Sequence, residues 1–215
     1  MSKVSSINAI YLATIPILGI YLLPGCIPLN WVLTVLLLII YFFSGTFANA
    51  FSKRSGETKW FLVILFVGFL GFALNSGNYF STSLFFNNHA TILIFFFSLI
   101  VFTAECNTKI FVNTLEVVGV AAAAVAIFQR IQLLLTGSFY VDFFIPGLDI
   151  IRDVESFTMS RVSSFFTEPA HLAIYLLPIS AILLKQGKFI LFAVTSLGIL
   201  FSGSTTGFLL LSAII

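Results

Sequence analysis

The sequence predicts an all-α membrane protein: a polytopic bundle of about seven complete transmembrane helices and the start of an eighth, with the N-terminus in the cytoplasm. The 215 residues are 60% hydrophobic and only 8% charged, whereas soluble domains average about 25% charged residues. Apolar stretches near the length of about 20 residues that a helix needs to cross a bilayer recur along the chain. Unbroken apolar runs such as Val32–Phe43 favour helices over alternating membrane strands.

The predicted spans are separated by short polar connections, and no convincing cleavage site follows the first, which we interpret as a retained helix. The spans are expected at Ile7–Leu23, Trp31–Phe51, Lys59–Asn75, His89–Thr103, Lys109–Phe128, Phe165–Leu184 and Lys188–Phe201. An eighth begins near Thr206 and is still too short to cross a bilayer at Ile215. We therefore expect residues 1–215 to form a single integral membrane domain, the N-terminal part of a longer protein.

The basic residues predict the orientation, because lysine and arginine stay on the cytoplasmic side of short loops. When the spans alternate, seven basic residues share one side: Lys3, Lys53, Arg54, Lys59, Lys109, Lys185 and Lys188. The other three, Arg130, Arg152 and Arg161, lie in the long segment 129–164 together with four acidic residues. This distribution predicts a cytoplasmic N-terminus and a long loop at 129–164 on the outer face.

The start of the sixth span has the strongest candidates for a functional site. Arg161 ends the long loop, and Glu168 comes just before the first helical turn, at the positive end of the helix dipole. His171 and Tyr175 follow at spacings that put them on roughly the same helix face as Glu168. Charged side chains at the edge of the hydrocarbon are functional candidates by default, because keeping them there is costly.

Three interpretations of these residues are open. The first is a helix cap with an interfacial ion pair, in which Thr167 caps the helix and Pro169 occupies its first turn. The second is a metal site, since Glu-x-x-His places two ligands on one helix face, but His89 is the only other histidine. The third is a site for an anionic substrate, because arginine matches phosphate with its fixed fork of donors and a carboxylate can act as a base.

Two further segments are predicted at the same outer face. Arg130, at the outer end of the fifth span, either snorkels to the interface or adds a second positive group to the site. The segment Ser202–Gly207 is either a tight turn between two helices or a site where exposed N–H groups bind a glycan or diphosphate. In the second case Ser204 and Thr205 are the substrate-binding candidates.

Two stretches, Arg161–Ala173 (RVSSFFTEPAHLA) and Ser202–Gly207 (SGSTTG), together resemble the O-antigen polymerase and ligase family. The alanine-rich fifth span ending in Phe128, Gln129 and Arg130 is similar to that family too. Its members often have an arginine in the second stretch where this chain has a threonine. Members also have further spans and a second large outer loop, which again implies that this chain corresponds to an N-terminal part.

The resemblance implies a metal-independent membrane glycosyltransferase. Such an enzyme polymerises polyprenyl-diphosphate-linked repeat units on the outer face of the cytoplasmic membrane, for capsule, exopolysaccharide or O-antigen synthesis. The expected partners are the lipid-linked glycan donor and acceptor, membrane lipid, and the flippase and chain-length regulator of the same pathway, with no cofactor and no nucleic acid. The predicted site residues are Arg161, Glu168 and His171 for catalysis and Arg130, Ser204 and Thr205 for substrate binding.

Three alternative functions remain open. A ligase would transfer the glycan to a lipid or wall anchor from the same kind of donor. A transporter or flippase would need ionisable residues or helix breaks at mid-membrane. Pro16 and Pro178 interrupt predicted spans, but the one ionisable residue inside a span, Glu116, lies about a turn and a half from the cytoplasmic end of the fifth span, which disfavours a transporter. The third alternative is an inactive remnant of a truncated gene.

Overall fold

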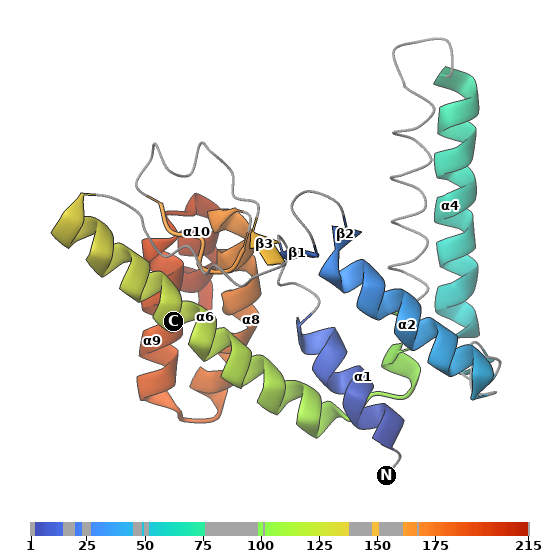
Figure 1. Ribbon diagram of the computed structural model, residues 1–215, viewed down its shortest axis with the longest axis horizontal. Coiled ribbons are helices and arrows are strands. Elements are labelled where there is room, and N and C mark those ends of the chain that lie inside the picture. The colour runs from blue at the N-terminus through green and yellow to red at the C-terminus, as the bar shows by residue number, and fades with distance from the viewer. Residues whose placement is uncertain are drawn as a thin grey trace. The chain divides into compact units, whose positions relative to one another are not determined.

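The computed structural model of the chain describes residues 3–14, 20–22, 27–44, 49, 52–75, 99–100, 102–137, 148–150, 161–166 and 168–214. Within these residues the chain is helical, with one small sheet (Figure 1). The helices are α1 (Lys3–Thr14), α2 (Leu29–Phe43), α4 (Ser55–Asn75), α6 (Thr108–Thr136), α8 (Pro169–Lys185), α9 (Phe189–Phe201) and α10 (Thr205–Ile214), and the strands are β1 (Ile20–Leu22), β2 (Ile27–Pro28) and β3 (Leu148–Ile150). Among the described helices α6 alone is long and apolar enough to cross a membrane, judged by length and composition.

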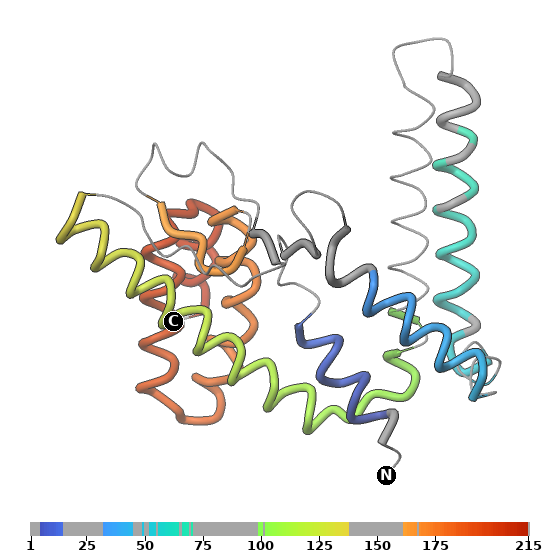
Figure 2. The backbone as a smooth tube through the Cα atoms, in the orientation of Figure 1, coloured from blue at the N-terminus to red at the C-terminus, as the bar shows by residue number. Residues whose placement is uncertain are grey.

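The chain divides into two compact units, and the predicted single membrane domain stays a prediction. Unit 1 comprises Met1–Leu12 and Trp31–Asn107, and unit 2 comprises Ala13–Asn30 and Thr108–Ile215. The continuous path from α8 through α9 to α10 in unit 2 can be followed without a break in Figure 2.

Polar and aromatic side chains join α1 to α2 in unit 1. Asn8 donates a hydrogen bond to the hydroxyl of Tyr41, and the hydroxyls of Tyr11 and Thr34 are hydrogen-bonded. The ring of Phe102 lies edge-on to those of Tyr11 and Tyr41, with centroids 5.2 and 5.5 Å apart. The contact between α1 and α2 therefore includes buried polar groups that hydrogen-bond to each other, as most buried polar groups do, although Asn8 Oδ1 is buried without a hydrogen-bond partner among the described residues.

Two connections of unit 1 meet beside helix α1. Lys53 Nζ lies 3.6 Å from Glu105 Oε1, and Asn8 Nδ2 donates to the carbonyl oxygen of Glu105 at 3.2 Å. The backbone N–H of Asn107 donates to the carbonyl oxygen of Ser5, also at 3.2 Å. The sequence predicts that both connections and the N-terminus face the cytoplasm.

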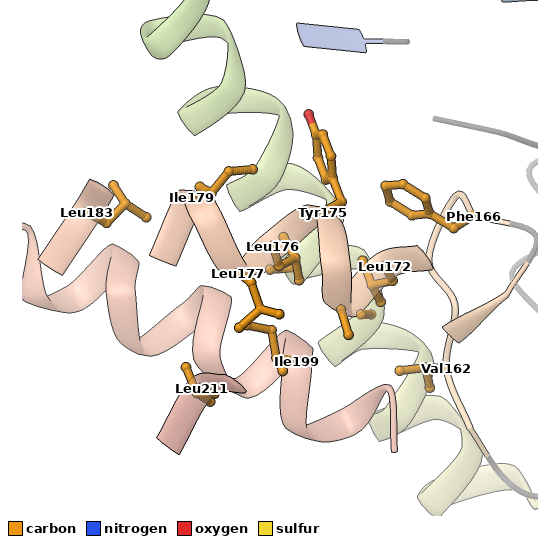
Figure 3. Close-up of a cluster of buried hydrophobic side chains, with 14 residues drawn as sticks. Val162, Phe166, Leu172, Tyr175, Leu176, Leu177, Ile179, Leu183, Ile199 and Leu211 are labelled. Carbon is orange, nitrogen blue, oxygen red and sulfur yellow. The ribbon is translucent and has the colours of Figure 1, made fainter. Parts of the chain in front are cut away.

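The core of unit 2 lies where α6, α8, α9 and α10 pack together (Figure 3). A Cβ added to Gly207 would lie 2.6 Å from the Cβ of Ala173, and one added to Gly198 would lie 2.9 Å from the Cβ of Ala123. These helices therefore touch at small residues, which let helix backbones approach each other closely. The larger core side chains are Val162, Phe166, Leu172, Leu176, Ile179, Leu183, Ile199 and Leu211.

The small sheet links two segments that are far apart in the sequence. Strand β1 pairs antiparallel with both β2 and β3, so that Tyr21 lies opposite Pro28 on one side and Asp149 on the other. Strand β2 overlaps the predicted outer connection Pro24–Asn30, and β3 belongs to the long segment 129–164. The pairing thus joins two segments that the sequence predicts on the same face. The strands themselves were not predicted.

The predicted first span is wrong in its second half. Helix α1 ends at Thr14, and Ile20–Leu22 forms strand β1, so Ile7–Leu23 is not one continuous helix. Pro16 gives the physical reason, because a proline lacks the N–H for a helical hydrogen bond and disfavours helical backbone in the residue before it. By contrast Pro178 lies inside α8 without ending it. The predicted fourth span, His89–Thr103, lies mostly outside the described residues.

The predicted end of the fifth span, and with it the start of the long loop, is also wrong. Helix α6 continues past Phe128 to Thr136, so Arg130 lies within a helix and not in a loop. Residues 131–135 are isoleucine, glutamine and leucines, which favour a helix. Gly137, with φ +67°, then ends it, as glycine commonly does just after a helix. The later helices begin and end within a few residues of the predicted spans.

Candidate functional site

Arg161 lies against the turn between α9 and α10. Its Nε donates a hydrogen bond to the carbonyl oxygen of Ser202 at 3.2 Å. A Cβ added to Gly203 would lie 3.2 Å from the Cγ of Arg161, and Gly203 has φ +64°, a conformation that glycine adopts without strain. The two stretches that the sequence singles out separately are therefore in contact at Arg161.

Serine hydroxyls fix the shape of this turn. The hydroxyl of Ser202 donates to the carbonyl oxygen of Ile199 at 2.6 Å and accepts from the backbone N–H of Ser204 at 3.2 Å. The hydroxyl oxygen of Ser204 accepts from the N–H of Gly207 at 3.2 Å, which caps the start of α10. Ser204 is buried, whereas Thr205 is exposed and accessible to a substrate. The substrate-binding role predicted for both residues stays a prediction.

The Arg161 segment is also bound to α6. The N–H of Ser164 donates to Gln129 Oε1 at 2.9 Å, and Gln129 Nε2 donates back to the carbonyl oxygen of Ser164 at 3.3 Å. The hydroxyl of Ser164 donates to the carbonyl oxygen of Ala122 at 2.7 Å. Arg130 directly follows Gln129 in α6 and is half-buried, so its backbone lies beside this contact.

Helix α8 starts one residue later than the predicted cap implies. Glu168 occupies the cap position with extended backbone and no side-chain capping bond, and Pro169 is in the first turn as predicted; the predicted cap Thr167 lies outside the described residues. Glu168 is exposed and His171 half-buried. In the part of the chain that the structure describes, no ion pair joins Glu168 to Arg161, so their predicted roles rest on the motif.

Helices α8 and α10 begin at the same end of unit 2 as Arg161. The close contact between Ala173 and Gly207 joins their first turns, and helix N-termini bear partial positive charge. Tyr175, predicted on the face of Glu168, is buried; its ring lies 5.2 Å from that of Phe166 and its hydroxyl donates to the carbonyl oxygen of Ala13 at 2.8 Å. A guanidinium in contact with the turn before α10, at the end of unit 2 where α8 also begins, is an arrangement suited to a phosphate-like anion.

The other end of unit 2 has a charge pair that the sequence did not predict. The carboxylate of Glu116 in α6 accepts from Gln186 Nε2 at 2.7 Å and from Lys188 Nζ at 2.5 Å. Its side chain is 9% exposed, and that of Lys188 is 44% exposed. Glu116 thus has hydrogen-bond and ion partners in the turn between α8 and α9, and the transporter alternative stays untested. We call the end of unit 2 that is formed by Glu116, Gln186 and Lys188 the Glu116 end.

Three residues were missed as site residues by the sequence reasoning: Gln129, Ser164 and Gly203. A glutamine in an alanine-rich apolar helix was the one available signal, because a buried amide needs partners. Among the described residues no group of three or more His, Cys, Asp and Glu side chains is arranged to hold a metal ion, and the predicted lack of a metal or cofactor stays a prediction. Comparisons with protein-family models, curated proteins and solved structures found no match to this chain.

Proposed function

We propose that the chain is a multi-pass protein of the cytoplasmic membrane that polymerises polyprenyl-diphosphate-linked glycan repeat units on the outer face, with Arg161 binding the donor diphosphate. The observation that supports this best is the contact of Arg161 with the Ser202–Gly203 turn, which makes one site of the two stretches that resemble the polymerase family. Arg161 uses Nε for the bond to Ser202, and the N–H groups of its two Nη atoms can donate a forked pair of hydrogen bonds to phosphate oxygens.

Exposed apolar side chains support the membrane location. Phe43 of α2 is 82% exposed, Leu135 of α6 is 80% exposed and Ile190 of α9 is 81% exposed. Large apolar patches of this kind mark contact with a membrane or another protein, and they recur on helices of both units. Together with the spanning length of α6, they favour helices that contact lipid.

The contacts also agree with the sidedness that the basic residues predict. Lys53 and Glu105 join two connections that are expected in the cytoplasm. Glu116, near the predicted cytoplasmic end of the fifth span, pairs with Lys188 of the connection between the sixth and seventh spans. Arg161 contacts a turn that is expected on the outer face. Within each unit, every one of these pairs joins segments predicted on the same side.

The proposed reaction transfers the growing glycan from its lipid diphosphate to an acceptor hydroxyl. The bond between the anomeric carbon and the diphosphate oxygen breaks, and its electron pair leaves on the diphosphate, whose charge Arg161 stabilises. The acceptor hydroxyl forms the new glycosidic bond and gives its proton to a base, for which Glu168 and His171 are the candidates. Arg130 adds positive charge at the same end, and the exposed Thr205 offers a hydroxyl to the glycan.

The test compares arginine variants in the native host lacking its own copy of the gene. Arg161→Ala is expected to lower polymerisation at least about 100-fold, the usual effect of removing one charge-stabilising donor, with an unchanged amount of protein in the membrane. Arg161→Lys keeps the charge without the fork and is expected to retain partial activity. The matched control is Arg54→Ala, because the side chain of Arg54 is 40% exposed and pairs with Glu57, three residues further along the chain. Its glycan ladder should be normal.

Gel analysis of the surface glycans separates the alternatives. Single repeat units in place of long chains indicate a polymerase. Long chains that stay on the lipid carrier indicate a ligase, which would use the same diphosphate site. A normal ladder from Arg161→Ala at normal protein level contradicts the proposed role of Arg161, and a normal ladder after deletion of the whole gene leaves the transporter or the inactive remnant.

A further inference from the structure

Gln129 and Ser164 make a two-point contact in the interior of unit 2. The side-chain amide of Gln129 accepts from the N–H of Ser164 and donates to its carbonyl oxygen. Gln129 is 2% exposed and Ser164 is 0% exposed. The side chain of Gln129 therefore pairs with the backbone N–H and carbonyl of Ser164, as a neighbouring strand does in a sheet, and this pairing is buried.

The backbone of Ser164 is in a conformation that needs such support. Its φ is +54°, which is uncommon for a residue other than glycine and costs about 1–2 kcal/mol. Such conformations persist where surrounding contacts over-determine them. Here the contacts are the two bonds to Gln129 and the hydroxyl bond to the carbonyl oxygen of Ala122, so α6 sets the direction in which the chain passes through Ser164.

Arg161 is only three residues before Ser164, and the two residues between them are buried. Its backbone position therefore follows from the contact with α6, while its side chain is bound to the carbonyl oxygen of Ser202. We propose that Gln129 is a positioning residue, which fixes the segment 161–166 so that the guanidinium of Arg161 meets the diphosphate at the right place. This inference rests on the proposed function and adds a residue to it.

Glutamine suits this role better than the residues nearest to it in shape. Methionine has nearly the same volume but can neither accept from nor donate to the backbone of Ser164. Asparagine has the amide but is one methylene shorter and does not reach both atoms. An ionised glutamate has acceptors only, so it would lose the bond to the carbonyl oxygen of Ser164.

The test is a double-mutant cycle between Gln129 and Arg161. Membranes from the host strain lacking its own copy are supplied with polyprenyl-diphosphate-linked repeat units extracted from that host, and initial rates give kcat and KM. Gln129→Met is expected to lower kcat about 10- to 100-fold, as small misplacements of a catalytic group do. In the Arg161→Lys background the same change is expected to cost less than about 3-fold, because residues that act through one another are not additive.

Gln132→Met is the matched control, since Gln132 lies one turn further along α6 and is not one of the Ser164 partners. It should leave kcat unchanged in both backgrounds. Equal losses from Gln129→Met in both backgrounds, or full activity of Gln129→Met beside an inactive Arg161→Ala, overturn the positioning role. An active Arg161→Ala overturns the proposed function instead. If Gln129→Met does not accumulate in the membrane, Gln129→Asn is used in the same cycle with the same expected pattern.

Discussion

The charged side chains at the two ends of unit 2 have different kinds of partner. At the Glu116 end both carboxylate oxygens are occupied, one by an amide and one by a lysine ammonium. At the end of Arg161, the guanidinium is bound through Nε to a neutral carbonyl oxygen. The same helix, α6, contributes to both ends, through Glu116 at one and Gln129 at the other, about 20 Å apart at 1.5 Å per residue.

This difference separates structural charges from candidate functional ones. A charge that is already paired with an opposite charge attracts a charged ligand less strongly. A charge whose position is fixed by neutral groups keeps its attraction for an oppositely charged substrate, which is the property of preorganised sites. The composition of unit 2 alone does not reveal this, because both ends have a charge beside a helix turn.

The largest expected effect is an all-or-none difference in thiol labelling, which tests whether the two ends of unit 2 face opposite sides of the membrane. In a chain whose two cysteines are changed to serine, Thr205→Cys or Lys185→Cys provides a single exposed thiol at each end of unit 2. With a membrane-impermeant maleimide on spheroplasts, we expect labelling at position 205 without permeabilisation and at position 185 only after it. Labelling of both positions from the same side would show that the two ends do not face opposite sides.

Replacing Cys106 is needed in this experiment even though we expect its thiol to react slowly. Burial raises the pKa of its thiol, and the thiolate is the reactive form, so its background labelling is low but not zero. Cys26 is predicted at the outer face and would be labelled together with position 205 if it were kept.

The second prediction concerns an asymmetry within the Glu116 end. Lys188→Met leaves the buried carboxylate of Glu116 without its ion partner and is expected to lower the free energy of unfolding by roughly 2–3 kcal/mol. Glu116→Gln leaves Lys188, whose side chain is 44% exposed, free to reach water, and is expected to cost less than about 1 kcal/mol. Titration of the purified protein with SDS measures both changes.

The double variant and the activity per molecule sharpen this prediction. Glu116→Gln combined with Lys188→Met should recover most of the stability, because no buried charge is left. Polymerisation per molecule of folded protein should be unchanged in all three variants. A loss of activity at full stability would mean that the Glu116 end takes part in the reaction, and the contrast between the two ends would fail.

The helices of unit 2 were predictable because each depends on local signals. Pro169 in the first turn marks the start of α8, and polar residues at 185–188 separate it from α9. The same reasoning placed Arg161, Ser204 and Thr205 at one face, through the count of basic residues. These signals need only hydropathy, charge and turn chemistry.

The contacts between segments were not predictable in the same way. The bonds of Gln129 to Ser164 span 35 residues of sequence, and that of Arg161 to Ser202 spans 41. Neither hydrophobic periodicity nor helix propensity indicates which polar groups of two distant segments will form hydrogen bonds. The long α6 and the strand at Ile20–Leu22 were mispredicted for a related reason: a span was assigned from hydropathy, which does not distinguish where a helix stops from where the chain leaves the hydrocarbon.

The smallest expected effect compares two glycine turns, one at each end of unit 2. Gly187 has φ +73° and Gly203 has φ +64°, so an alanine at either position suffers the same backbone strain of about 1–2 kcal/mol. The surroundings differ, because a new Cβ at 187 meets no atom within 4 Å, whereas one at 203 lies 3.2 Å from Arg161 Cγ and 3.4 Å from its Nε.

Arg161 is a flexible side chain and can move aside from that Cβ, so the added contact should cost little stability. Its displacement should nevertheless weaken the bond to Ser202 and lower polymerisation about 10-fold, which corresponds to about 1.4 kcal/mol in the barrier. We therefore expect Gly187→Ala and Gly203→Ala to unfold at similar SDS concentrations, with reduced activity per folded molecule in Gly203→Ala alone. If the two variants have equal activity, the position of Arg161 over the turn has no part in the reaction, and the end of Arg161 would be as purely structural as the Glu116 end.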